Sequence, residues 1–348
     1  MTGGNFMNKM YYDVHEILPY NALLNFIVGE RGVGKTYSCK KFVIQDFLKK
    51  GVQFVYLRRY KTELKEACKD FFAGLLANKE FEEHQFKIVQ DKNGCIFMCD
   101  GEVMGYGLTL STAVILKSRE FPLIRTIIYD EFIIDKGTYK YLTNEVHTFL
   151  DIMETIGRTR DIRCLLLGNA VSRTNPYFLY FKINEPYQST VKVCKKDKNG
   201  GNLILFNYIA NQAYREMKKN SRFGQLIEGT EYGRYAIDNK WLHENKAFVG
   251  KRPDDARFFF IMMFGGVKYG VWSDWRDNKV YISTKYDPSC PAIYTLSNDD
   301  HDQNTTLVVA RSSSFFKKLL EYYRNGLLYF ETQSVKEMIL PYINKYIN

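Results

Sequence analysis

Residues Asn25–Phe42 read NFIVGERGVGKTYSCKKF. An apolar run leads into a glycine-rich segment that ends in a lysine and a threonine. Gly29 to Thr36 match the pattern G-x-x-x-x-G-K-[ST]. In such a loop, backbone N–H groups turn inward around phosphate oxygens, and the N-terminus of the following helix adds positive potential. The stretch therefore predicts a strand, a phosphate-binding loop and a helix that runs to Lys50.

The residue types in this loop suit nucleotide binding. Lys35 would place its charge on the β- and γ-phosphates, and the Thr36 hydroxyl would ligate Mg²⁺. A glycine-rich turn with an exposed lysine is the alternative, but the strand before the loop and the helix after it favour a nucleotide site. The expected nucleotide-binding residues are Gly29, Glu30, Arg31, Gly32, Val33, Gly34, Lys35 and Thr36.

A second apolar run, Leu123 to Phe132, ends in two acids. The carboxyl ends of parallel strands meet at one edge of a sheet, so Asp130 is expected beside the phosphate loop as a second anchor for Mg²⁺. Glu131 would polarise a water for attack on the γ-phosphate. The long interval between Lys35 and Asp130 leaves room for a strand between the two motif strands. This is the additional-strand arrangement of motor ATPases with a catalytic glutamate, whereas the guanine-reading Asn-Lys-x-Asp motif of GTPases is missing.

The segment RCLLLGNA predicts a further strand with Asn169 at its end, where an amide could sense the γ-phosphate. Capping of the next helix is the alternative for Asn169. Just before this strand, GRTRDIR carries Arg158, Arg160 and Arg163. One of them could serve as an arginine finger for a neighbouring subunit, and a solvated basic turn is the alternative.

Basic residues also follow other predicted strand ends. Such side chains suit contacts with a phosphate backbone, which require charge rather than base-reading geometry. A solvated start of a helix is an equally open interpretation. The residues are Arg58, Arg59, Lys61 and Lys65 in YLRRYKTELK, and Lys117 and Arg119 in LKSRE.

Composition limits the class of protein. The 348 residues carry a formal net charge of +10, which attracts polyanions such as nucleic acid. The seven cysteines are scattered without a C-x-x-C pair, so we expect reduced thiols rather than a disulfide framework or a zinc site. No window of about 20 apolar residues could span a bilayer, which predicts a soluble, intracellular protein without a membrane partner.

The order of elements predicts an α/β fold. Strands alternate with helices over the first 185 residues or so, which indicates a parallel sheet covered by helices on both faces. Beyond that point a hairpin with a charged turn and a helical stretch follow, and from Thr230 the chain is mostly strand-like before it ends in helical stretches. We expect a P-loop domain at 1–206, a linker at 207–228 and a smaller α+β domain at 229–348.

Taken together, these motifs resemble those of the DNA-packaging motor ATPases of small phi29-type bacteriophages, additional-strand ATPases of the FtsK/HerA and terminase kind. The similarity extends over nearly the whole chain. Its segments, in order, are NFIVGERGVGKTY, FVYLRRYKTEL, IIYDEF, NEVHTFLDIMETIGRTRDIRCLLLGNAVSRTNPYFLYF, RFGQLIEGTEYG and DPSCPAIYTLSNDD.

The resemblance implies a homo-oligomeric, pentameric ring at the portal vertex of a procapsid in the host cytoplasm, where ATP hydrolysis with Mg²⁺ drives double-stranded DNA inside. It leaves open whether a structural packaging RNA bridges the ring and the capsid. It also implies that the C-terminal domain has a ribonuclease-H-like fold without nuclease activity. The segment KVCKKDKNGGNLILFNYIANQ matches the family poorly, which leaves the linker geometry open.

The resemblance also implies roles for single residues. Asp130 supports Mg²⁺ and Glu131 is the catalytic glutamate. Arg158 matches the arginine that acts in trans, although Arg160 stays an alternative because this chain is one residue shorter before the next strand. Lys61 lies in the loop expected to face DNA in the pore. The phosphate loop binds ATP, and Asn169 takes the polar position at the strand end.

Two other functions remain as alternatives. A terminase-type enzyme with an active nuclease would need clustered acids that hold two metal ions. The segment DWRDN is better interpreted as a hairpin turn with Asp277 and Asn278 at its tip. A small-molecule kinase is the third possibility, against which the extra domain and the Asp-Glu pair weigh. The acids available for a nuclease are Asp274, Asp277, Asp299, Asp300 and Asp302.

Overall fold

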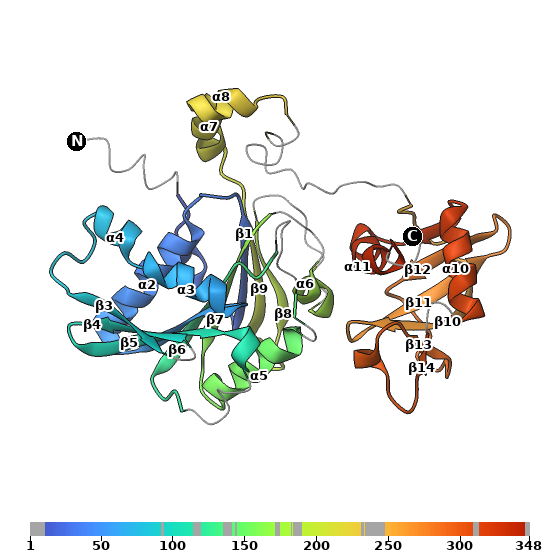
Figure 1. Cartoon of the computed structure of the whole chain (residues 1–348), viewed down its shortest axis with the longest axis horizontal. Helices are drawn as coiled ribbons and strands as arrows, with labels where there is room; N and C mark the ends of the chain where they lie inside the picture. Colours follow the sequence, from blue (N-terminus) through green and yellow to red (C-terminus); the bar gives the residue numbers. More distant parts are fainter. Residues whose placement is uncertain are drawn as a thin grey trace. The chain divides into compact units, whose positions relative to one another are not determined.

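Two compact units make up the chain in the computed structural model (Figure 1). One unit is built from residues 1–171 and 184–242, and the other from residues 172–183 and 243–348. The structure describes residues 11–91, 94–113, 120–134, 141–142, 145–170, 175–181, 183, 190–230, 233, 248–308 and 313–344. Among these described residues, no helix is long and apolar enough to cross a membrane.

A nine-stranded sheet, counted over the described residues, forms the first unit, in the order β3-β4-β5-β2-β6-β7-β1-β9-β8. The strands from β5 to β9 in this order are parallel to their neighbours, and antiparallel hairpins form the two edges. Its strands are β1 (Leu24–Gly29), β2 (Gln53–Arg58), β3 (Phe86–Asp91), β4 (Gly94–Cys99), β5 (Glu102–Thr109), β6 (Ile124–Asp130), β7 (Arg163–Asn169), β8 (Thr190–Lys196) and β9 (Asn202–Ile209).

Helices cover both faces of this sheet, as predicted. On one face Ile128 and Leu165 join the core cluster that also contains Val43 of α2. On the other face the Tyr129 ring stacks on Phe149 of α5, with ring centroids 5.7 Å apart. The described helices of this unit are η1 (Val14–Glu16), η2 (Leu18–Tyr20), α2 (Lys35–Lys50), α3 (Lys61–Lys69), α4 (Ala73–Ala77), α5 (Glu145–Gly157), α7 (Gln212–Asn220) and α8 (Arg222–Ile227).

The additional strand is present, but it does not come from the interval that we expected. Strand β7 lies between β1, which carries the phosphate loop, and β6, which ends in Asp130. It follows Asp130 in the chain. The strands from the interval between Lys35 and Asp130 all lie beyond β6 instead. The two motifs are therefore one strand apart, and Asn169 at the end of β7 lies between them.

Strand β9 continues further than the sequence indicates. Its residues pair with β1 as far as the register pair Gly29 and Ile209. The linker expected to begin at residue 207 therefore starts inside β9, because the apolar run of this strand extends to Ile209. Helices α7 and α8 then fill most of the interval expected to be linker.

The second unit has its own sheet and core. The strand order over its described residues is β14-β13-β10-β11-β12-β15, with β10, β11 and β12 antiparallel. Phe260 and Ile282 of the sheet pack with Phe316 of α10 and Ile339 of α11. The ribonuclease-H-like assignment stays a prediction. The elements are α6 (Pro176–Tyr180), β10 (Arg257–Phe264), β11 (Val267–Asp274), β12 (Lys279–Ser283), β13 (Ile293–Thr295), η4 (Asn298–Asp300), β14 (Thr306–Leu307), α10 (Ser314–Arg324), β15 (Leu328–Phe330) and α11 (Gln333–Asn344).

Candidate nucleotide site

The phosphate loop joins β1 to α2 as its motif requires. Gly32 and Gly34 have φ angles of 87° and 92°, in the left-handed region that favours glycine. At the end of β1, a Cβ on Gly29 would lie 2.6 Å from the Ile209 carbonyl oxygen, so no side chain fits there. Val33 is fully buried and anchors the loop to the core. The glycines thus allow a backbone path that other residues would strain or block.

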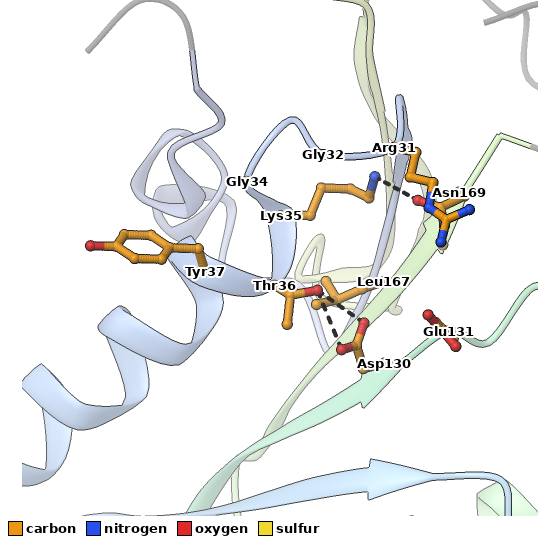
Figure 2. A pocket seen from close by; sticks show the side chains of 11 residues that line it. Arg31, Gly32, Gly34, Lys35, Thr36, Tyr37, Asp130, Glu131, Leu167 and Asn169 are labelled. Atoms are coloured by element: carbon orange, nitrogen blue, oxygen red, sulfur yellow. Dashed lines mark hydrogen bonds between the residues drawn. The ribbon is translucent and has the colours of Figure 1, made fainter. Parts of the chain in front are cut away.

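Lys35 lies at the start of α2, and its ammonium group is held by three oxygens, of which Figure 2 shows the bond to Asn169. Its Nζ donates to the Glu30 carbonyl at 2.7 Å, to the Gly29 carbonyl at 3.2 Å and to Asn169 Oδ1 at 3.2 Å. Burial lowers the pKa of Lys35 to about 8, and the negative charges of Asp130 and Glu30 oppose that shift. Lys35 and Asn169, predicted from separate segments, therefore meet directly.

Thr36 and Asp130 also meet directly. The Thr36 hydroxyl donates to Asp130 Oδ1 at 3.1 Å, and the Tyr56 hydroxyl donates to Asp130 Oδ2 at 2.8 Å. Burial and the neighbouring Asp130 raise the pKa of Tyr56, so its phenol keeps the proton that it donates. A hydroxyl beside a carboxylate is the oxygen ligand set that Mg²⁺ takes together with phosphates, so these residues fit the expected ion.

Glu131 follows Asp130 with a φ angle of 61°, an unusual conformation for a residue other than glycine. Its carboxylate is ion-paired with Arg58, with 2.6 Å between Oε2 and Nη2. The same guanidinium lies 3.6 Å from Asp130 Oδ2. The Glu131 side chain is 55% exposed, so it can be reached by solvent from the cavity. Arg58 thus holds both motif acids.

A single cavity gathers these groups. It has a volume of about 260 Å³ and is bordered by the loop, the start of α2 and the ends of β6 and β7. Of the predicted catalytic and metal-binding residues, only Arg158 is not part of its wall. The lining residues are Arg31, Gly32, Gly34, Lys35, Thr36, Tyr37, Asp130, Glu131, Leu167, Gly168 and Asn169.

The structure gives Arg58 and Arg59 a different environment from the one expected of DNA contacts. Both arginines are buried, with exposed fractions of 8% and 2%. Arg59 Nε and Nη2 bind the two carboxylate oxygens of Glu145 at 2.8 and 3.0 Å, and Nη2 also donates to the Phe132 carbonyl. Their charge is thus satisfied within the chain, which argues against contact with a DNA backbone. Lys61, at the start of α3, is exposed.

The other basic residues named in the sequence analysis differ in their exposure and contacts. Lys65 is exposed on α3, whereas Lys117 and Arg119 lie outside the described residues. Arg163 donates to Asn21 Oδ1 at 3.1 Å.

The two candidate arginine fingers differ clearly in environment. Arg160 Nη2 donates to the backbone carbonyls of Phe121, at 2.8 Å, and Ile156. The Arg158 side chain is 57% exposed, and it forms a 3.7 Å ion pair with Glu120, which is itself exposed. Arg158 has a φ angle of 51° and directly follows α5. Arg160 is therefore engaged by backbone carbonyls of its own chain, whereas Arg158 is largely accessible to solvent.

Sequence reasoning missed Tyr56 as a partner of Asp130. Tyr56 lies within the apolar strand β2, and there its hydroxyl is indistinguishable from any aromatic of a core strand. Only the pairing of β2 with β6, which matches Leu57 with Tyr129, brings it to the carboxylate. No local signal could have identified it.

These features define a P-loop NTPase of the additional-strand class. They are a strand, phosphate loop and helix, an additional strand between the two motif strands, and an Asp-Glu pair at the carboxyl end of β6. The chain also matches the family described as Podovirus DNA encapsidation protein (Gp16), over residues 7–346. This protein belongs to that family.

Individual relatives agree with this assignment. The chain is 35% identical to the DNA packaging protein of Bacillus phage phi29 over 339 residues, which cover 97% of this chain and 98% of the relative. A chain of the solved bacteriophage phi29 viral genome packaging motor assembly is 33% identical, with a TM-score of 0.71 and coverage of 97% and 100%. The solved N-terminal domain of the phi29 DNA packaging ATPase is 34% identical, with a TM-score of 0.52 and coverage of 59% and 98%.

Proposed function

We propose that this protein hydrolyses ATP in the cavity at the phosphate loop and uses the energy to move double-stranded DNA into a procapsid. The observation that carries the proposal is the convergence of Lys35, Thr36, Asp130, Glu131 and Asn169 on one cavity. The relatives support it, since they are a DNA packaging protein and a chain of a genome packaging motor assembly.

The chain's own residues divide the chemistry among them. Lys35 and the loop N–H groups bind the β- and γ-phosphates, and Thr36 and Asp130 would hold Mg²⁺. The ion, when bound, would neutralise charge on the phosphate oxygens. Glu131 orients the attacking water and accepts its proton, which requires its carboxylate to leave the Arg58 guanidinium. We propose that Asn169, whose amide oxygen accepts from Lys35, contacts the γ-phosphate.

We further propose a homo-oligomeric ring, with five subunits, at the portal of the procapsid in the host cytoplasm. In a head-to-tail ring every subunit presents the same surface to the next one's site. An exposed arginine such as Arg158 can then complete a neighbour's cavity. The proposal includes a structural packaging RNA only as an additional binding partner of the ring.

A direct test is the ATPase rate with and without duplex DNA. We expect duplex DNA to raise the rate, as it would for a motor and not for a small-molecule kinase. Lys35→Ala is the control for the site, because it removes the charge that meets the phosphates and should abolish nucleotide binding with the fold intact. An ATPase rate that is the same with and without DNA would refute the proposal. So would an ATP affinity of Lys35→Ala equal to that of the unaltered chain.

DNA affinity should depend on backbone charge, with Lys61 among the contacts. We expect the logarithm of affinity to fall with the logarithm of salt concentration at a slope near −0.9 per phosphate neutralised, with little sequence preference. Lys61→Ala should flatten this slope by about one unit, measured by fluorescence anisotropy of a labelled duplex. Lys69→Ala, at the other end of α3, is the matched control and should leave the slope unchanged. Strong preference for one duplex sequence would contradict backbone binding.

The second unit offers little support for the nuclease alternative. Asp300 accepts from the backbone N–H groups of Gly265 and Gly266, and Asp274 accepts from the N–H of Arg276. Within the described part of this unit, no three His, Cys, Asp or Glu side chains lie close enough to share a metal ion. Asp274 and Asp300 are thus bound to backbone N–H groups of turns, and Asp277 lies in the predicted hairpin turn between β11 and β12.

A further inference from the structure

The phosphate loop is held from outside the motif by helix α7, which follows β9 in the chain. Glu30, the second residue of the loop, is 3% exposed, and its carboxylate is ion-paired with Arg215 of α7. The same carboxylate accepts from the backbone N–H of Asn211, the N-cap residue of α7, at 3.3 Å. One loop side chain is thereby engaged by both a side chain and the N-terminus of the helix.

Tyr214 extends the contact to the next two residues of the loop. Its hydroxyl donates to the Arg31 carbonyl at 3.4 Å. A Cβ placed on Gly32 would lie 2.3 Å from the same hydroxyl oxygen, so the tyrosine is seated directly against the loop backbone. Tyr214 is itself 9% exposed. Helix α7 therefore contacts three consecutive residues of the phosphate loop.

Glu30 connects this contact to the phosphate-binding lysine. Its side chain faces α7, while its backbone carbonyl accepts from Lys35 Nζ at 2.7 Å. A displacement of α7 would leave the buried carboxylate without its guanidinium, and an unpaired charge in such a place is strongly unfavourable. The loop would have to rearrange to hydrate Glu30, and the carbonyl that orients Lys35 would move with it. Burial raises the pKa of Glu30 and Arg215 opposes this shift, which agrees with the ion pair.

We infer that Arg215 and Tyr214 are positioning residues for the phosphate loop, and that nucleotide binding is coupled to the docking of α7. The inference rests on the proposed function, because it requires ATP to bind at this loop. Coupling of this kind is reciprocal, so bound nucleotide stabilises the docked helix as much as the docked helix favours nucleotide. Helix α7 directly follows β9, which pairs with β1. Whether nucleotide is bound or absent therefore changes how firmly α7, the first helix after this strand, is docked.

The test is a set of variants with nucleotide affinity as the readout, measured by titration with a fluorescent ATP analogue. Arg215→Met removes the charge and keeps the length of the side chain, and should weaken binding by about 5- to 150-fold. Arg215→Lys should recover part of the loss. Adding Glu30→Gln to Arg215→Met should cause no further loss, because the unpaired carboxylate is removed as well. Lys219→Met, on the same helix but paired with Glu228, is the matched control and should bind like the unaltered chain.

A second readout on the unaltered chain keeps the inference testable if Arg215→Met does not fold. Hydrogen exchange should slow at the amides of residues 212–220 when the ATP analogue binds. Unchanged exchange there, together with slowed exchange in the phosphate loop, would overturn the coupling. A folded Arg215→Met variant that binds the ATP analogue with normal affinity would also overturn the coupling. If the unaltered chain binds no ATP analogue at all, the proposed function fails as well, and the two failures are therefore distinguishable.

Discussion

Arg158→Ala is expected to bind ATP and, in the assembled ring, to hydrolyse it about 10³- to 10⁵-fold more slowly than the unaltered chain. Lys35 and Glu131 account for phosphate binding and water activation, but charge that develops on the γ-phosphate needs a further cation. Arg158 is exposed after α5 and absent from its own chain's cavity wall, which favours action on a neighbouring subunit. The measurement is steady-state ATPase rate with duplex DNA present to assemble the ring.

Mixing two inactive variants distinguishes action in trans from action within one chain. Arg158→Ala mixed with Glu131→Gln should recover part of the activity, because some interfaces then pair an intact Arg158 with an intact Glu131. Arg125→Ala, which removes another exposed arginine, is the control and should keep normal activity. A mixture whose rate is strictly additive would place the arginine in its own subunit's mechanism, or assign the finger to Arg160 against its bonds to Phe121 and Ile156.

Glu131→Gln should slow hydrolysis by about 10²- to 10⁴-fold, the usual contribution of a general base, while ATP stays bound. Glutamine keeps the size of the side chain and can still orient a water, but it cannot accept the proton. Single-turnover hydrolysis of prebound ATP measures the chemical step directly. Glu154→Gln, an exposed glutamate on α5, is the matched control. Near-normal turnover in Glu131→Gln would place the base elsewhere.

The motifs that depend on short segments could be predicted from the sequence. The phosphate loop and α2 have the predicted order, and α2 ends at Lys50 as expected. The hairpin turn at Asp277 and Asn278 is likewise a local pattern, and it is confirmed between β11 and β12. Such features need only neighbouring residues and backbone geometry, so one sequence carries enough information.

Features set by contacts between distant segments could not be predicted in the same way. The strand between β1 and β6 follows Asp130 in the chain, because strand order depends on how helices cross the sheet and not on the length of an interval. Arg59 has the local pattern of an exposed basic residue. Its partner Glu145 lies 86 positions further along the chain, and only the fold buries the two together.

The contact of α7 with the phosphate loop is another example of this limit. Arg215 lies 185 positions after Glu30, in a segment that looks like an ordinary polar helix. We expected a linker over this interval, at 207–228, although the residues there have a helical pattern. The contact of α7 with the phosphate loop depends on the pairing of β9 with β1, which brings the start of α7 next to the loop.

If ATP hydrolysis at the phosphate loop moves DNA, as we claim, the movement can be measured as packaging. Linear duplex DNA would be incubated with ATP, portal-bearing procapsids and this protein, and the DNA protected from added nuclease would be measured over time. We predict protected DNA that accumulates with ATP for the unaltered chain, and none for Glu131→Gln even though that variant binds ATP and DNA. Equal protection by Glu131→Gln, or by the unaltered chain with a non-hydrolysable analogue in place of ATP, would contradict the claim.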